Sequence, residues 1–254
     1  MKFVGIIPAR YASTRFPAKV LAMLNGKTVI QRVYEQVKDC FDDLYVATDD
    51  SRIAEVVTSF GGKAIMTSED CKNGTERCFD ACCKLNIDCD VVVNVQGDEP
   101  FIQRKQIESL MACFADERTD IATLVKPFEQ ADGWERLSNP NSPKVVLNAD
   151  NFAMYFSRSV VPYLRGVEQS EWLDIHVFYK HLGVYAYRLN LLKEITSLLQ
   201  TPLEKVESLE QLRWLEHGYK IKVGVTNIET IGIDTPEDLE RAKEFASSIG
   251  LCWE

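Results

Sequence analysis

Residues 91–100 read Val-Val-Val-Asn-Val-Gln-Gly-Asp-Glu-Pro, and this stretch decides the fold. Its first five residues form an apolar run broken by a single Asn, which is typical of a strand buried on both faces. Strands of this kind belong to parallel sheets whose two faces are covered by helices. The run stops at Gly97-Asp98, so a carboxylate follows directly after the carboxyl end of the strand.

The segments around this strand repeat the same order of strand and helix. Further strands are predicted at residues 2–7, 44–48, 63–66 and 121–125. Apolar residues at helical spacing predict helices over residues 28–40, 51–60, 75–85 and 103–115, with Ser51 as the N-cap of the second. This order predicts an α/β protein with a Rossmann-like, mostly parallel sheet and helices on both faces. Ligands of such sheets bind beyond the carboxyl ends of the strands.

The pattern changes after about residue 127. Residues 144–147 and 153–157 are predicted to pair as strands across the turn 148–151, and a loop is predicted over 161–171. A strand at 181–187, a helix over 203–218, a strand at 221–225 and a helix over 236–247 complete the chain. Because there is no linker or internal repeat, we predict a single domain over residues 1–254 with a β-rich insertion at about 127–190.

Composition narrows the class of partner. The chain has 254 residues and a net charge of −9, which argues against binding to nucleic acid or to an anionic membrane surface. No apolar run approaches the roughly 20 residues of a membrane span, and the run after Lys2 ends at Pro8, too early for a signal peptide. The eight cysteines include no CxxC pair, which favours reduced thiols. We therefore predict a cytoplasmic protein that acts on small molecules.

The loop after the first strand carries clustered positive charge. Residues 8–19 read Pro-Ala-Arg-Tyr-Ala-Ser-Thr-Arg-Phe-Pro-Ala-Lys and contain Arg10, Arg15 and Lys19. Guanidinium groups and a Lys ammonium are the groups that bind phosphate oxygens, and small neighbours such as Ala9 let the backbone approach them. A solvated basic loop is the alternative. The acidic background and the position after a strand favour a triphosphate site.

Two carboxylates are candidates for a metal site. Asp98 follows the buried strand, and Asp234 lies in the stretch Ile-Gly-Ile-Asp-Thr-Pro-Glu-Asp at residues 231–238. Magnesium in proteins takes one or two carboxylates and leaves its other positions to phosphate and water. Asp is also common in turns, and Thr235 with Asp238 predicts a helix N-cap, so turn formation and capping are the alternatives.

Several of these stretches together resemble the sugar-activating nucleotidyltransferases, and within them the cytidylyltransferases that act on the sugar acid 3-deoxy-manno-octulosonate (Kdo). The resemblance rests on residues 6–19, 94–100 and 232–240, and on four further motifs in the same order. These read Asn-Gly-Thr-Glu-Arg at 73–77, Tyr-Phe-Ser-Arg at 155–158, His-Leu-Gly-Val-Tyr at 181–185 and Leu-Glu-Gln-Leu-Arg at 209–213. It covers about residues 2–240. The family usually has Ser where this chain has Asn73, which keeps a small hydrogen-bonding side chain.

The resemblance implies an activity and a set of site residues. It implies transfer of CMP from CTP to the anomeric 2-hydroxyl of Kdo, with release of pyrophosphate, for lipopolysaccharide biosynthesis. It implies that Arg10, Arg15 and Lys19 hold the CTP phosphates and that Asp98 and Asp234 hold a catalytic Mg²⁺. The residues implied near the base are Ala9, Thr67, Asn73 and Gly74. Those implied around the sugar acid are Arg77, Gln96, Arg158, His181, Tyr185 and Glu210.

Two other functions stay open at this point. The acceptor could be neuraminate or an amino-modified Kdo, although the motifs at 181–185 and 209–213 do not support neuraminate. A binding protein without catalysis could use the same fold. Such a protein has no need for a metal-binding pair of carboxylates, so Asp98 and Asp234 favour an enzyme. The resemblance also implies a homodimer formed through residues of about 150–190.

Overall fold

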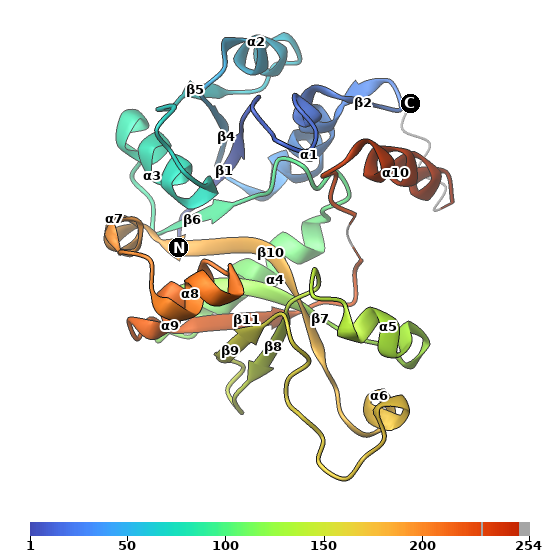
Figure 1. Cartoon of the computed structure of the whole chain (residues 1–254). Coiled ribbons are helices and arrows are strands. Elements are labelled where there is room, and N and C mark those ends of the chain that lie inside the picture. The colour runs from blue at the N-terminus through green and yellow to red at the C-terminus, as the bar shows by residue number, and fades with distance from the viewer. Residues whose placement is uncertain (230, 249–254) are drawn as a thin grey trace. The chain divides into compact units, whose positions relative to one another are not determined.

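The computed structural model describes residues 1–229 and 231–248 (Figure 1). The chain folds as two compact units, the first formed by Met1–Ile107 with Glu229–Glu254 and the second by Glu108–Ile228. The predicted β-rich insertion at about 127–190 lies inside the second unit, which extends beyond it on both sides. The description as one domain with an insertion stays a prediction.

A parallel sheet organises the first unit. Its strands are β1 (Phe3–Ala9), β4 (Asp43–Thr48), β5 (Ala64–Met66) and β6 (Val91–Asn94). β1 pairs in parallel with β4 on one side and β6 on the other, and β5 pairs in parallel with β4. All four residues of β6 are buried, as the apolar run predicts. The predicted α/β class with a mostly parallel sheet is confirmed.

The helices of this unit follow the strands as predicted. They are α1 (Val29–Val37), α2 (Ser51–Ser59), α3 (Gly74–Leu85), α4 (Arg104–Ala112, which continues into the second unit) and α10 (Pro236–Ser248). The prediction that Ser51 caps α2 is wrong. Asp50 is the N-cap, because its carboxylate accepts a hydrogen bond from the amide of Arg52 at 3.0 Å. A short hairpin, β2 (Met23–Leu24) with β3 (Lys27–Thr28), precedes α1.

The start of α10 is fixed by a cap and by packing. Asp238 accepts hydrogen bonds from the amides of Asp234 at 3.0 Å and Thr235 at 2.9 Å, while the Thr235 hydroxyl accepts from the amide of Asp238 at 3.2 Å. The predicted capping by Thr235 is confirmed. Leu239 and Ala242 pack in one apolar cluster with Leu24 of β2. This packing holds the carboxyl-terminal helix, and Asp234 before it, close to the segment that follows the first loop.

The second unit is built on a mixed sheet. β7 (Ile121–Pro127) pairs in parallel with β11 (Ile221–Val225) and antiparallel with β10 (Tyr179–Arg188). β8 (Lys144–Leu147) and β9 (Ala153–Ser157) pair antiparallel, and β8 also pairs with β10. The predicted pairing of residues 144–147 with 153–157 is confirmed.

Helices of the second unit differ most from prediction. The helix predicted over 203–218 is two helices, α8 (Pro202–Glu207) and α9 (Gln211–Glu216), because Ser208 has a left-handed backbone with φ of 51°. Their ends are joined by a buried ion pair in which Arg213 donates to both carboxylate oxygens of Glu204, at 2.8 and 2.7 Å. Three short helices were not predicted: α5 (Gly133–Ser138), α6 (Trp172–Ile175) and α7 (Leu189–Ser197).

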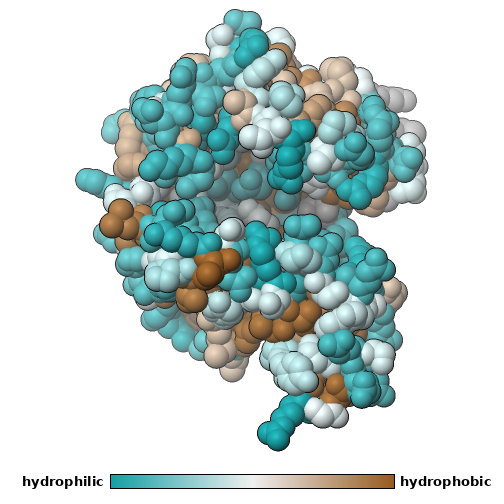
Figure 2. All heavy atoms as spheres, viewed as in Figure 1, coloured by the Kyte–Doolittle hydropathy of each residue, from teal (hydrophilic) through white to brown (hydrophobic). Residues whose placement is uncertain are grey.

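Most of the face shown in Figure 2 is hydrophilic, with hydrophobic side chains gathered over α7 and α8. In that region Leu199 and Val206 are 86% and 79% exposed. Among the described residues, no helix is long and apolar enough to span a bilayer.

Candidate active site

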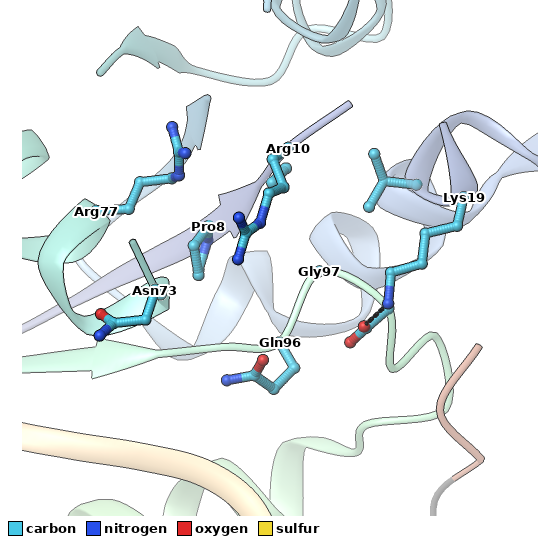
Figure 3. A pocket seen from close by; sticks show the side chains of 11 residues that line it. Pro8, Arg10, Lys19, Asn73, Arg77, Gln96 and Gly97 are labelled. Carbon is cyan, nitrogen blue, oxygen red and sulfur yellow. Dashed lines mark hydrogen bonds and ion pairs between the residues drawn. The ribbon is translucent and has the colours of Figure 1, made fainter. Parts of the chain in front are cut away.

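A pocket of about 190 Å³ opens at the carboxyl ends of β1 and β6 (Figure 3). Every residue that lines it belongs to the first unit. Its walls are made by Pro8, Ala9, Arg10, Lys19, Val20, Asn73, Gly74, Arg77, Gln96, Gly97 and Asp98. The pocket therefore lies where the parallel sheet is expected to bind ligands, and it collects residues from three of the sequence motifs, at 6–19, 73–77 and 94–100.

The first loop is folded by its own backbone. The carbonyl oxygen of Tyr11 accepts hydrogen bonds from the amides of Ser13 at 3.1 Å and Ala18 at 2.9 Å. Ala18 has a left-handed backbone with φ of 58°, and the 3₁₀ turn Lys19–Leu21 follows directly. This turn directs Lys19 into the pocket. Arg10 lines the pocket as well, and its Nη2 donates to the carbonyl of Lys72 at 3.3 Å.

Lys19 joins the two carboxylates that the sequence singled out. Its Nζ donates to Asp98 and to Oδ1 of Asp234, the latter at 2.8 Å. Arg15 donates to the other oxygen of Asp234 at 3.0 Å. In Figure 3 the Lys19 side chain extends to a carboxylate, with a dashed line marking the contact. Residues predicted separately as phosphate and metal ligands thus meet at one point.

The charge state of Lys19 follows from these contacts. Burial lowers the pKa of its ammonium, but the charges of Asp98 and Asp234 and the hydrogen bonds to them outweigh burial and raise the pKa above its usual value. The Lys19 side chain is only 15% exposed, whereas that of Asp234 is 46% exposed. Lys19 is therefore a firmly charged cation between two carboxylates that solvent still reaches.

The donor set fits a magnesium ion that substrate completes. Asp98 and Asp234 direct oxygen atoms at one cationic group, and carboxylate oxygen is the ligand that magnesium prefers. Within residues 1–229 and 231–248 no cluster of three or more His, Cys, Asp or Glu is placed to hold a metal. Two carboxylates without a third protein ligand suit an ion that keeps water and shares phosphate oxygens with a nucleotide.

Arg77 forms the buried wall of the pocket. Its guanidinium, 3% exposed, donates to Asp49 at 2.6 Å and to the hydroxyl of Thr67 at 2.6 Å. The structure therefore connects Arg77 and Thr67, which were predicted for different parts of the substrate. Asp49 was not predicted, although it follows directly after β4 and so lies at the same edge of the sheet.

The contacts of Asn73 show why this residue can stand where the family usually has Ser. It is the N-cap of α3, and its Oδ1 accepts from the amide of Glu76 at 2.8 Å. Asn and Ser are about equally good N-caps, so the exchange keeps the start of the helix intact. The next residue, Gly74, sits in a tight place, since an added Cβ would lie 3.3 Å from the side chains of Asn94 and Pro8.

Three predicted residues lie together in the second unit. His181 and Tyr185 are on β10 with ring centroids 5.4 Å apart, and Glu210 directly precedes α9. The Tyr185 ring also contacts Trp214 of α9, with centroids 5.2 Å apart. The Tyr185 hydroxyl, the Trp214 indole nitrogen and the Gln211 amide nitrogen are buried and have no hydrogen-bond partner among residues 1–229 and 231–248.

Such buried, unpaired donors are unusual in a folded protein, and a bound ligand or an ordered water is the kind of group that completes their hydrogen bonds. Gln211 and Trp214 were not predicted. Gln211 lies within the motif at 209–213, and Trp214 directly follows it. Their position next to Glu210 in the sequence is the signal from which both could have been predicted.

Arg158 has structural contacts that the sequence did not indicate. Its guanidinium donates to the carbonyl oxygens of Glu207 at 2.6 Å, Pro140 at 2.9 Å and Ser208 at 3.1 Å. It therefore satisfies backbone groups at the end of α8. Its predicted contact with a sugar acid stays a prediction.

The fold and the site define a class. An α/β protein whose strand ends carry a cluster of cations beside a pair of carboxylates has the construction of a nucleotidyltransferase. The chain belongs to the cytidylyltransferase family, whose model matches residues 4–221.

Individual relatives agree with this assignment. A 3-deoxy-manno-octulosonate cytidylyltransferase of Bacteroides thetaiotaomicron is 64% identical over 245 residues, covering 96% of this chain and 98% of its own. The enzyme of that name from Porphyromonas gingivalis is 53% identical and covers 98% of both chains. A solved structure of CMP:2-keto-3-deoxy-manno-octonic acid synthetase complexed with CTP matches with a TM-score of 0.89 at 37% identity. That match covers 98% of this chain and 100% of the other.

Proposed function

We propose that this protein transfers CMP from CTP to the anomeric 2-hydroxyl of Kdo and releases pyrophosphate. The observation that carries the proposal is the meeting of Arg15, Lys19, Asp98 and Asp234 at the mouth of a pocket beyond the strand ends. The substrates follow from relatives of 64% and 53% identity that are named for this reaction.

The first unit's residues would bind and orient CTP. Arg10 and Lys19 line the pocket as cations, and Arg15 lies at its edge through its pair with Asp234. Their charges favour the triphosphate and neutralise negative charge that develops on the leaving pyrophosphate. The small residues Ala9 and Gly74 leave space beside them for a nucleoside.

Asp98 and Asp234 are the residues that would hold a magnesium ion. Its chemistry there would be to neutralise phosphate oxygens and to lower the pKa of the attacking hydroxyl. The reaction balances without a redox partner: a bond forms from the sugar oxygen to the α-phosphorus, and the bond from that phosphorus to the pyrophosphate oxygen breaks. The hydroxyl proton is released.

In the second unit, unpaired buried donors support the binding of a polyhydroxylated acceptor. The hydroxyl of Tyr185 and the N–H groups of Gln211 and Trp214 would donate to sugar oxygens. Each buried donor that gains an acceptor recovers about 1–3 kcal/mol of desolvation cost. An acceptor without hydroxyls would leave them unpaired.

The test measures pyrophosphate release from CTP with Kdo and Mg²⁺, beside UTP, ATP and GTP, and beside neuraminate and 8-amino-Kdo as acceptors. Release that needs CTP and Kdo and stops with EDTA is the expected result. Asp98→Asn should lose at least about 100-fold in turnover, as for loss of a group that stabilises transition-state charge. Preference for 8-amino-Kdo would correct the acceptor alone. Binding of CTP without release for any acceptor would refute the proposal in favour of a binding protein.

The proposal extends to assembly and location. We propose a homodimer formed through about residues 150–190, where Tyr163, Ile175 and Val177 are exposed apolar side chains. Light scattering should give twice the chain mass, and Ile175→Glu should give the single mass. A monomeric wild type would refute the dimer. Because CTP is a cytoplasmic metabolite, the proposal places the reaction in the cytoplasm.

A further inference from the structure

A bulge in β10 brings two backbone carbonyls to one threonine. In the pairing with β7, Leu182 lies opposite Leu124 but Tyr185 lies opposite Thr123, so Gly183 and Val184 are extra residues. The hydroxyl oxygen of Thr123 is 2.8 Å from the carbonyl of Val184 and 3.2 Å from that of Leu182. Bulges redirect side chains and are common beside functional sites.

The same hydroxyl also contacts a histidine. Thr123 Oγ1 lies 3.0 Å from Nε2 of His181. A hydroxyl has one proton to donate, and carbonyl oxygens can only accept. With the proton of Thr123 given to a carbonyl, the contact with His181 is a hydrogen bond only if Nε2–H donates to the hydroxyl oxygen. The other ring nitrogen, Nδ1, then carries the lone pair of a neutral imidazole.

The surroundings keep this imidazole neutral and leave Nδ1 available. The ring contacts Phe156 and Tyr185, with centroids 5.1 and 5.4 Å away, and across the described ranges no second hydrogen bond to the ring is formed. Although the residue keeps some exposed surface, burial of the ring lowers the pKa of His181 to about 3. Burial also raises the pKa of Tyr185, its titratable neighbour, so both rings are uncharged at neutral pH.

We propose that Thr123 is a positioning residue that holds His181 in the Nε2–H tautomer, so that Nδ1 accepts a hydrogen bond from a hydroxyl of the acceptor sugar. The proposal rests on the proposed function, because that function supplies a polyhydroxylated acceptor. With this tautomer, the group of residues around His181 contains both hydrogen-bond acceptors and donors. Nδ1 of His181 is the acceptor, and the side chains of Tyr185, Gln211 and Trp214 are the donors. A sugar hydroxyl, which donates and accepts at once, matches that combination.

The tautomer can be measured without any substrate. The chain has three histidines, so a ¹⁵N-labelled sample gives three imidazole spin systems, and His181→Gln identifies the one in question. The expected result from pH 5.5 to 8 is a protonated Nε2 and an unprotonated Nδ1 at His181. A proton on Nδ1, or on both nitrogens, would overturn the proposal even if Thr123→Val does not fold.

Variants of Thr123 then test whether the tautomer of His181 affects binding of the acceptor sugar. Thr123→Val keeps the shape and removes the hydroxyl, and should shift the His181 signals toward a mixture of tautomers. It should raise KM for Kdo about five- to tenfold, the value of one hydrogen bond, with KM for CTP unchanged. Thr123→Ser, which keeps the hydroxyl, should show the His181 signals and the KM for Kdo of the wild type.

The matched control is Thr119→Val, which removes another buried threonine hydroxyl of the same unit, bonded to the carbonyl of Cys113 at 2.8 Å. It should leave the His181 signals and KM for Kdo unchanged. Thr123→Val with unaltered signals and kinetics would overturn the proposal. A wild type with the expected tautomer but no pyrophosphate release would instead refute the proposed function.

Discussion

Replacing Lys19 should change metal binding and nucleotide binding in opposite directions. Lys19 occupies the position between Asp98 and Asp234, so a metal ion held there as proposed would have to displace it when nucleotide is absent. Lys19→Met removes this competitor and keeps most of the side-chain volume. We therefore expect the variant to bind a divalent cation more tightly than the wild type when nucleotide is absent.

The magnitude follows from the contacts. At 2.8 Å, the distance from Lys19 Nζ to Asp234 Oδ1, two unit charges attract by about 6 kcal/mol at an effective dielectric constant of about 20. Desolvation offsets most of this, and a hydrogen bond between charged groups has a net value of about 1.5–3 kcal/mol. Loss of two such contacts at the low end gives about 3 kcal/mol, or roughly 100-fold in metal affinity.

The assay is calorimetric titration of Mn²⁺ into nucleotide-free protein, followed by titration of CTP in the presence of EDTA. Lys19→Met should bind Mn²⁺ roughly 100-fold more tightly and CTP at least about tenfold more weakly, because it lacks a phosphate-binding cation. Lys19→Arg, which keeps the charge, is the control and should resemble the wild type in the first titration. Equal or weaker Mn²⁺ binding by folded Lys19→Met would refute competition between Lys19 and the metal.

Three further changes test other parts of the molecule. Asp49→Ala leaves the buried Arg77 guanidinium without its carboxylate and should cost about 3 kcal/mol in urea unfolding, with weaker CTP binding, whereas Asp49→Asn should cost less. His181 has a folded-state pKa of about 3, below the unfolded value of about 6.5, so its contribution to stability is present above pH 6.5 and lost as the pH falls. Between pH 7.5 and 5.5 this loss is about 1 kcal/mol, and urea unfolding of His181→Gln should lack it. Gly97→Ala would place a Cβ 2.9 Å from the carbonyl oxygen of Pro8 in the pocket wall, so pyrophosphate release should fall at least about tenfold while secondary structure by circular dichroism stays unchanged.

Local sequence patterns predicted the elements whose burial is uniform or strictly periodic. The run at 91–95 gave a strand with all four of its assigned residues buried, and the hairpin of β8 and β9 followed from the turn between two apolar runs. The split between α8 and α9 was not predictable in this way. Ser208 adopts a left-handed backbone, and apolar residues continue at helical spacing through it, so periodicity alone cannot reveal the break.

The site residues could be predicted from sequence where a charged side chain comes soon after a buried strand. Arg10 and Asp98 follow β1 and β6, and parallel strands bring their carboxyl ends to one edge. The partners of these residues were harder to predict. Asp49 looked like an ordinary acidic residue before a helix, and only the packing of α3 against β4 places it beside Arg77. Gln211 and Trp214 are significant because their side-chain N–H groups form no hydrogen bond within the described part of the chain, which sequence cannot show.

The site residues of the two units differ in chemical kind, and this difference predicts how each group responds to its ligand. In the first unit the groups are ions. The mostly buried Lys19 ammonium pairs with Asp98 and Asp234, because an unpaired buried ion is too costly, whereas the exposed Arg15 adds a surface ion pair with Asp234. In the second unit the unpaired groups are neutral. Leaving a neutral donor unpaired costs about 1–3 kcal/mol, which a folded protein tolerates at a few positions. Under the proposed function, CTP binding would therefore exchange these ion pairs, whereas the sugar hydroxyls would add hydrogen bonds to the neutral donors. Added salt should consequently weaken CTP binding more strongly than the hydroxyl contacts of the acceptor, because screening acts on charges and leaves neutral hydrogen bonds largely unchanged.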